Sequence, residues 1–350
     1  MSPVPVITLC STDPVLRGSA AGALVCDIPG AVVLQHDIDI RTGDLRRVVY
    51  DASGVISDGE CRLEHACASC ATREDILPAL EELVARRPAA VILALPTALE
   101  AVPVLHAVRS VGGAVAAGVG TVVDLDSLLA DVTGADLLVD RGLAVAVEDD
   151  RLLGEVLVSQ LESADVVMYA SDGAAPDETA MALVSHLAGP GAATPWYSAP
   201  TGQLLRARPH ADRGDLRAVA ATEAVPAADV WTVDLSSRRP MHPTRLMERA
   251  EDLGGEAVRS KGHFWVASRP DLACAWDGAV GHVSVGRIGT WGGKQRTHLV
   301  VTGIGGEPGR VIDAFEAALL TDAELVGGIH SWAGAEDGLD PWLGAQHDVA

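Results

Sequence analysis

Lysine, aromatic residues and long apolar runs are all scarce in this chain of 350 residues. Lys261 and Lys294 are the only lysines, and aromatic residues make up 3% of the sequence. No apolar run reaches the roughly 18 residues that a membrane-spanning helix requires. The first residues carry no basic leader, so we expect no signal peptide. Together these absences predict a cytoplasmic protein.

Basic residues are too few to balance the acidic ones. The chain has 26 Lys and Arg residues against 48 Asp and Glu residues, which gives a net charge of −22. A surface this acidic repels phosphate groups, so we expect no direct binding of nucleic acid, and no basic amphipathic stretch suggests a membrane surface. The same charge favours a basic protein partner.

The six cysteines are few and irregularly spaced, which argues against a disulfide framework. Cys10, Cys26 and Cys274 lie in or near apolar stretches and are predicted to be unreactive small hydrophobic side chains. Cys67 and Cys70 stand three positions apart, and this Cys-x₂-Cys spacing is the main chemical signal in the sequence.

Residues 1–200 alternate between apolar, strand-like runs and amphipathic, helix-like runs. This alternation predicts an α/β domain built on a mainly parallel sheet. Glu74 and Asp75 are expected to favour the N-terminus of the clearest helix. The strands are expected at 5–10, 31–39, 45–53, 89–96, 113–124 and 164–171, and the helices at 72–87, 153–163 and 177–189.

The rest of the chain has a different pattern. Residues 201–227 are rich in Pro, Gly and Ala and are predicted to be a linker. Residues 228–326 are predicted to form a small α+β domain, and 327–350 a polar tail. Within the small domain we expect a strand at 229–237, a helix at 242–255, antiparallel strands over 257–305 and a closing helix at 308–320.

The Cys-x₂-Cys pair admits three interpretations. Zinc usually takes four ligands, so Cys67 and Cys70 would supply two, with His65 as a third and Glu64 or Cys61 as a fourth. A thiol pair beside a helix N-terminus also fits a redox pair, because that position lowers a thiol pKa. The third interpretation is packing within the core. The sequence favours the metal site formed by Cys67, Cys70 and His65.

Several motifs resemble those of CobW-type proteins. Residues 239–248 (RPMHPTRLME), 258–276 (VRSKGHFWVASRPDLACAW) and 317–325 (AALLTDAEL) resemble the C-terminal domain of that family. Residues 67–76 (CASCATREDI) resemble the family's metal motif, Cys-x-Cys-Cys followed by Arg, an acidic pair and a helix, with Ser69 in place of the middle cysteine. The resemblance implies a P-loop GTPase-like first domain, a CobW C-terminal domain and binding of zinc.

The GTPase motifs of that family are missing here. Residues 10–24, where a phosphate loop should follow the first strand, contain no Gly-Lys-Ser/Thr, and Asp13 adds negative charge. The family's Glu-Ser-Thr-Gly falls on 94–97 (ALPT), and its guanine-binding Asn-Lys-x-Asp falls on 170–173, where only Asp172 is acidic. We therefore expect a degenerate domain that binds neither GTP nor Mg²⁺. Any enzymatic activity would be GTP hydrolysis.

One branch of the family shares this pattern, together with a tail similar to 340–348 (DPWLGAQHD). This branch, often named MRF, recruits a ribosome hibernation factor under zinc starvation. The resemblance implies a zinc-responsive adaptor without GTPase activity, whose partner is a ribosome hibernation promotion factor and, through it, the ribosome. The alternative is a CobW-type GTP-dependent zinc or metal chaperone.

Other histidines and tryptophans are given structural roles. His242, just before Pro243, is predicted to cap a helix. His263, Trp265 and Trp276 are predicted to lie mostly in the core or at an interface.

Overall fold

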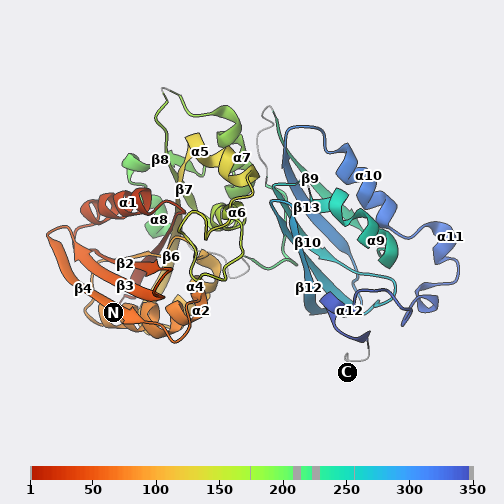
Figure 1. Ribbon diagram of the computed structural model, residues 1–350, viewed down its shortest axis with the longest axis horizontal. Helices are drawn as coiled ribbons and strands as arrows, with labels where there is room; N and C mark the ends of the chain where they lie inside the picture. The colour runs from red at the N-terminus through yellow and green to blue at the C-terminus, as the bar shows by residue number, and fades with distance from the viewer. Residues whose placement is uncertain (1, 174, 208–213, 223–228, 256, 347–350) are drawn as a thin grey trace. The chain divides into compact units, whose positions relative to one another are not determined.

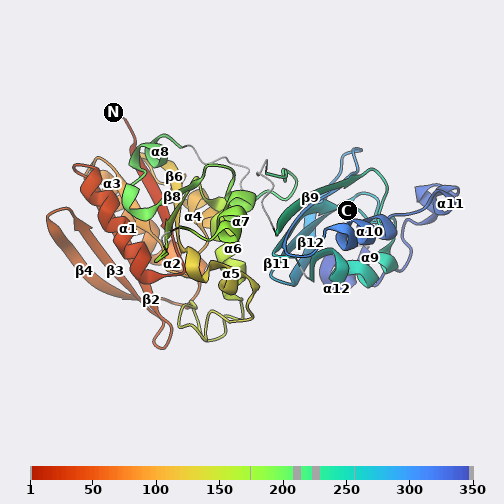
Figure 2. The same ribbon diagram turned by 90° about the horizontal axis from the view of Figure 1, so that it is seen from above.

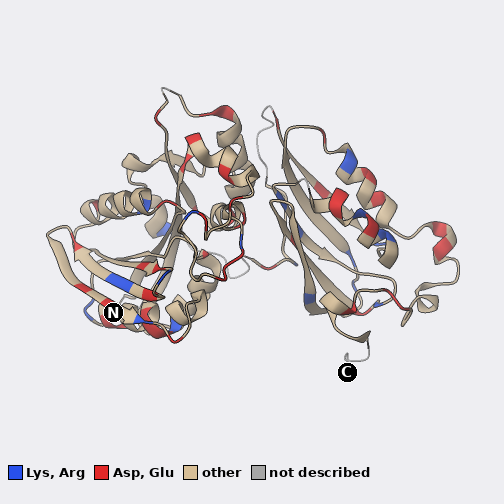
Figure 3. Ribbon diagram, in the orientation of Figure 1, with Lys and Arg blue, Asp and Glu red and all other residues tan. Residues whose placement is uncertain are grey.

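The computed structural model describes residues 2–173, 175–207, 214–222, 229–255 and 257–346. They form two compact units, Met1–Gly214 and Asp215–Ala350 (Figure 1). Acidic residues are spread over both units and outnumber the basic ones (Figure 3). Among the described residues, no helix is both long and apolar enough to cross a membrane.

The first unit is built on an eight-stranded sheet with the order β4-β3-β2-β5-β1-β6-β7-β8. Strands β2, β5, β1, β6, β7 and β8 run parallel, whereas β3 and β4 add an antiparallel edge. Fully buried runs such as β5 are typical of parallel strands covered on both faces. The strands are β1 (Val4–Cys10), β2 (Val32–Asp39), β3 (Asp44–Asp51), β4 (Gly54–Arg62), β5 (Val91–Ala94), β6 (Ala114–Asp124), β7 (Val166–Ala170) and β8 (Ala193–Pro195).

Helices cover both faces of this sheet (Figures 1 and 2). Side chains of α1 and α8 fill the core on one face, and those of α3, α4 and α6 fill the core on the other. The helices are α1 (Pro14–Asp27), α2 (Ala68–Ala71), α3 (Leu77–Ala85), α4 (Ala101–Val108), α5 (Leu125–Thr133), α6 (Leu153–Ser163), α7 (Glu178–Ala188) and α8 (Thr201–Arg206), with a π-helical turn η1 at Thr72–Ile76 and a 3₁₀ turn η2 at Trp196–Ser198.

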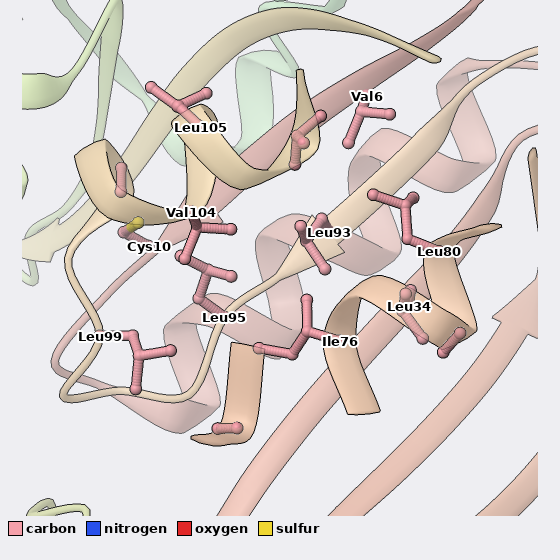
Figure 4. Packing of buried hydrophobic residues seen from close by; sticks show 14 of the residues in the cluster. Val6, Cys10, Leu34, Ile76, Leu80, Leu93, Leu95, Leu99, Val104 and Leu105 are labelled. Carbon is pink, nitrogen blue, oxygen red and sulfur yellow. The ribbon is translucent and has the colours of Figure 1, made fainter. Parts of the chain in front are cut away.

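The helix that follows the two cysteines is anchored by the second of these cores. Ile76 and Leu80 belong to a cluster with side chains from five strands, including Leu34 of β2 and Leu93 of β5 (Figure 4). Because these side chains are fully buried, the helix has little freedom to shift along the sheet. The position of the two cysteines that precede this helix is therefore restrained by the core.

The second unit contains a five-stranded antiparallel sheet with the order β12-β11-β10-β13-β9. Helices α9 and α10 cover one face, and the core there includes Phe264, Trp276 and Phe315. The elements are β9 (Val230–Ser237), α9 (Pro243–Ala250), η3 (Glu251–Gly255, a π-helical turn), β10 (Arg259–Phe264), β11 (Leu272–Ala279), β12 (His282–Thr290), β13 (Thr297–Ile304), α10 (Gly309–Ala318), α11 (Asp322–Leu325), η4 (Ile329–Ser331, a 3₁₀ turn) and α12 (Asp340–Leu343).

The predicted fold class is confirmed: an α/β unit on a mainly parallel sheet precedes a small α+β unit. The predicted cap is also confirmed, because His242 Nδ1 accepts a hydrogen bond from the Arg245 backbone N–H at 3.4 Å. His263, Trp265 and Trp276 are buried, as expected. Cys26, expected among the unreactive hydrophobic side chains, is instead exposed on α1.

Two segments differ from the expected division of the chain. Residues 201–206, placed in the linker by composition, form α8, whose Leu204 is buried against the first unit. The segment 327–350, predicted to be a polar tail, buries Leu339 and Leu343 in the core of the second unit. The large apolar residues of this stretch are separated by Gly and acidic residues in no regular period, so composition alone did not reveal its packing.

A buried ion pair and further hydrogen bonds of Arg269 hold this last segment in place. Arg269 is 5% exposed at its side chain and pairs with Asp337, which is 1% exposed, at 2.7 Å. Arg269 also donates to Asp340 and to the Gly344 carbonyl. We call Arg269, Asp337 and their hydrogen-bond partners the tail clamp.

Candidate functional site

Cys67 and Cys70 lie together at the start of a helix. Cys67 is the N-cap of α2, and its sulfur accepts a hydrogen bond from the Cys70 backbone N–H at 3.3 Å. The helix therefore begins at Ala68, about one turn earlier than the sequence pattern predicted. A thiol can cap a helix because the first N–H groups have no partner within the helix.

The two thiols have opposite proton affinities. The pKa of Cys67 is lowered because the Cys70 backbone N–H donates to its sulfur. The pKa of Cys70 is raised because its thiol donates a hydrogen bond to Cys67, and burial and the nearby Glu74 carboxylate raise it further. Cys67 is thus the thiol that loses its proton more readily, and thiolate is the form that binds a metal or attacks a disulfide.

The Glu74 carboxylate holds the segment that leads into this helix by hydrogen bonds. One carboxylate oxygen accepts from the Glu64 backbone N–H at 2.9 Å, and the other accepts from Arg73 at 2.9 Å. The hydrogen bond from Glu64 is the main cause of the lowered pKa of Glu74. Glu74 lies in the π-helical turn η1, and such turns are frequent at functional sites.

The other predicted ligands are not gathered around the thiols. Across residues 61–76, all of which are described, no three His, Cys, Asp or Glu side chains form a group able to hold a metal. His65 and Glu64 are exposed. Cys61 lies on β4, and its thiol donates to the carbonyl of its neighbour Arg62 at 3.8 Å. Only Cys67 and Cys70 of the predicted donors are in direct contact.

Asp75 ties the cysteine-bearing helix to the sheet. Its carboxylate bonds His36 Nε2 of β2 at 2.9 Å and Arg47 of β3 at 2.8 Å. Burial alone would raise the pKa of Asp75, but the hydrogen bond from His36 and the charge of Arg47 hold it below its usual range. Sequence analysis placed Asp75 at the helix N-terminus, whereas it lies in the second turn and is 4% exposed.

The connection between β1 and α1, where a phosphate loop would lie, is too short for such a loop and is capped by its own carboxylate. Only Ser11, Thr12 and Asp13 separate β1 from α1, and the Asp13 carboxylate accepts from the Val15 and Leu16 N–H groups at 2.7 and 2.9 Å. These are the free helix-end N–H groups that would bind a phosphate. A resident carboxylate therefore occupies that role.

The nearest buried cation is also engaged. Arg17 on α1 is fully buried and donates to Asp37 and to the carbonyls of Leu95 and His36. Because Asp37 already pairs with Arg17, this arginine is not available to bind a phosphate. This pairing was not predicted from the sequence, because Asp37 lies on β2, 20 positions further along the chain.

A cavity of about 450 Å³ lies beside this loop, at the carboxyl ends of β1 and β6. Ligands of open α/β sheets usually bind at such an edge. The cavity is lined by Asp13, Asp124 and Asp131, and its single arginine, Arg141, pairs with Asp131 at 3.4 Å. Its charge suits a cation or a neutral group better than a triphosphate.

Residues 230–319 match the family model of the cobalamin synthesis protein cobW C-terminal domain. The chain is 28% identical over 354 residues to the zinc chaperone Rv0106 of Mycobacterium tuberculosis strain H37Rv, covering 85% of this chain and 83% of that relative. It is equally similar to the uncharacterized protein Mb0109 of Mycobacterium bovis. A crystal structure of Zn(II)-bound YjiA GTPase from E. coli aligns at a TM-score of 0.41 and 15% identity, over 91% of this chain and 100% of that one. Residues 230–319 thus form a CobW C-terminal domain.

Proposed function

We propose that the protein is a CobW-type zinc chaperone that carries the ion on Cys67 and Cys70. The observation that carries the proposal is the thiol pair at the start of α2, where the Cys67 sulfur accepts the Cys70 N–H and its pKa is lowered. A relative of similar length is named a zinc chaperone, and the CobW C-terminal domain supports the same interpretation.

An incomplete ligand shell suits cargo better than a structural ion. Zinc prefers four ligands, and Cys67 and Cys70 provide two. Glu74 lies beside Cys70 and would have to release the Glu64 N–H or Arg73 to bind the ion. Water or a thiol of the receiving protein would complete the shell, so the ion is held and can be passed on.

Replacing Cys67 or Cys70 by serine is expected to remove one equivalent of zinc per chain, because a serine hydroxyl is a poor zinc ligand. Metal analysis of the purified protein, after equilibration with limiting zinc, measures this loss. Cys26→Ser is the matched control, because Cys26 is exposed on the same unit and distant in sequence. Unchanged zinc content in both Cys67→Ser and Cys70→Ser would refute the assignment of the site.

A substitution that should raise zinc affinity tests the same site. Ser69→Cys would restore the thiol that the family's motif has between these two cysteines. A third thiolate should tighten zinc binding by roughly tenfold or more. Competition with a chromophoric chelator compares the two dissociation constants, with Ser53→Cys on the exposed β3–β4 turn as the control for an added thiol. Equal affinities in Ser69→Cys and the parent protein would contradict the site.

We propose that zinc handling in this chain proceeds without GTP hydrolysis. The support is the Asp13 cap on α1, the pairing of Arg17 with Asp37 and the carboxylates around the adjacent cavity. Titration calorimetry with GTP and Mg²⁺ is expected to give no binding in the low micromolar range, and hydrolysis no faster than the buffer background. Low-micromolar binding would instead support a GTP-dependent chaperone.

A second candidate function is the zinc-responsive adaptor that recruits a ribosome hibernation promotion factor. The acidic charge of −22 favours it, because a basic protein partner would be attracted. The comparisons support the zinc chaperone better. Pull-down with this chain from zinc-depleted and zinc-replete cells separates the two, since the adaptor requires a salt-sensitive complex with the hibernation factor that is lost in the double Cys67→Ser, Cys70→Ser variant.

A further inference from the structure

Two histidines face each other on the second unit. His263 of β10 and His298 of β13 are directly paired across the antiparallel ladder, and their ring centroids are 5.7 Å apart. Their neighbours Phe264 and Leu299 point into the helix-covered core. Because side chains alternate along a strand, both rings lie on the other face of the sheet.

Each ring is fixed in one tautomer by its hydrogen-bond partner. His263 Nδ1 is 2.9 Å from the Leu216 carbonyl oxygen, which can only accept, so Nδ1 carries the proton. His298 Nε2 is 2.8 Å from the Asp234 carboxylate, so there Nε2 carries it. The unshared electron pair is therefore on Nε2 of His263 and on Nδ1 of His298.

This is the arrangement of histidines that bind metals. A metal-bound imidazole almost always donates its other N–H to a backbone carbonyl or a carboxylate, which orients the ring and strengthens the ligand. His263 has the carbonyl and His298 has the carboxylate. Two imidazoles on one tetrahedral zinc, each at about 2.0–2.1 Å, place their centroids roughly 5–6 Å apart, and the observed separation falls in that range.

The strands hold the two rings close. A Cβ at Gly262 would lie 2.0 Å from the His298 carbonyl oxygen, so β10 and β13 approach at a point where only glycine fits. Trp291 packs edge-on against the His263 ring, with centroids 5.5 Å apart. The close approach of β10 and β13 thus fixes the distance between the two histidine rings.

We infer that His263 and His298 form a second zinc-binding position, on the CobW C-terminal domain, whose remaining ligands are water or the side chain of a bound partner. The choice of zinc as the ion rests on the proposed function, and the position rests on the geometry of the two rings. With two ligands, the position would bind zinc weakly and release it readily, as a transfer step requires.

The test uses the full chain with the first position removed by Cys67→Ser and Cys70→Ser. Zinc binding to this parent is measured by competition with a chromophoric chelator. It is then compared in three further variants, which add His298→Gln, His263→Gln or His330→Gln. His330 is exposed on η4 of the same unit and serves as the matched control. Co²⁺ provides a spectroscopic readout, because histidine ligation gives visible bands without the sulfur charge-transfer band of a thiolate site.

We expect the parent to bind about one zinc ion and His298→Gln to weaken that binding roughly tenfold or more, with no change in His330→Gln. If His263→Gln fails to fold, His298→Gln decides alone, since its partner Asp234 is half-exposed. No zinc bound by the parent, or equal affinity in His298→Gln and the parent, would overturn the inference. Neither result bears on Cys67 and Cys70, whose loss is measured separately in the chain that retains both histidines.

Discussion

Asp75→Ala is expected to lower the free energy of unfolding by about 2–4 kcal/mol. The substitution would leave the fully buried His36 ring without its hydrogen-bond acceptor and Arg47 without its counter-charge. The same change frees the cysteine-bearing helix from β2 and β3, so zinc affinity should fall with stability. Denaturant unfolding measures the first effect, and chelator competition on the folded protein measures the second.

Arg73→Ala is the control for this prediction. Arg73 lies two residues away on the same helix, but its side chain is 68% exposed and its ion pairs with Glu64 and Glu74 are at the surface. Surface pairs contribute up to about 1 kcal/mol. Equal destabilisation by Asp75→Ala and Arg73→Ala would mean that the His36–Asp75–Arg47 network does not anchor the helix.

Arg269→Ala is expected to destabilise the second unit by about 3–5 kcal/mol, because it leaves the buried Asp337 carboxylate without its partner. The tail segment that carries Leu339 and Leu343 should then detach more readily. Limited proteolysis and denaturant unfolding would detect this. Arg249→Ala removes the surface pair with Asp252 and should change stability by less than about 1 kcal/mol.

The tail clamp also predicts a pH dependence. Burial opposes ionisation of Asp337, but its hydrogen bonds from Arg269 and Ser268 lower its pKa from 3.8 to about 2. A carboxyl with a lowered pKa stabilises the folded state fully above its unfolded value and loses that contribution as the pH falls toward the folded one. The difference in unfolding free energy between wild type and Asp337→Asn should therefore shrink by about 2 kcal/mol from pH 5 to pH 2. A difference that stays constant over that interval would contradict the role of Asp337.

The sequence predicted those parts of the fold that rest on strong local signals. The apolar runs that became β1 and β5 are long enough to mark buried parallel strands. Helix α1 was missed because its Ala- and Gly-rich sequence has no clear apolar period. Strand β4 was missed because it is an exposed edge, and pairing with β3 alone does not require an apolar face.

Only those contacts of the candidate site that join residues close together in the sequence could be predicted. The Cys-x₂-Cys spacing placed Cys67 and Cys70 side by side, because a helix start brings residues three apart together. The partners of Asp75 come from β2 and β3, and no spacing in the sequence connects them. The prediction that His65 binds the metal with them remains untested.

The tail clamp joins residues far apart along the chain, since Arg269 and Asp337 are 68 positions apart. Such contacts tend to form late in folding, after the strands and helices between them have assembled. Interactions absent from the folding transition state slow unfolding without speeding folding. We therefore expect the clamp to lengthen the lifetime of the folded second unit more than it speeds folding, and so to slow cleavage by proteases that act on transiently opened chains.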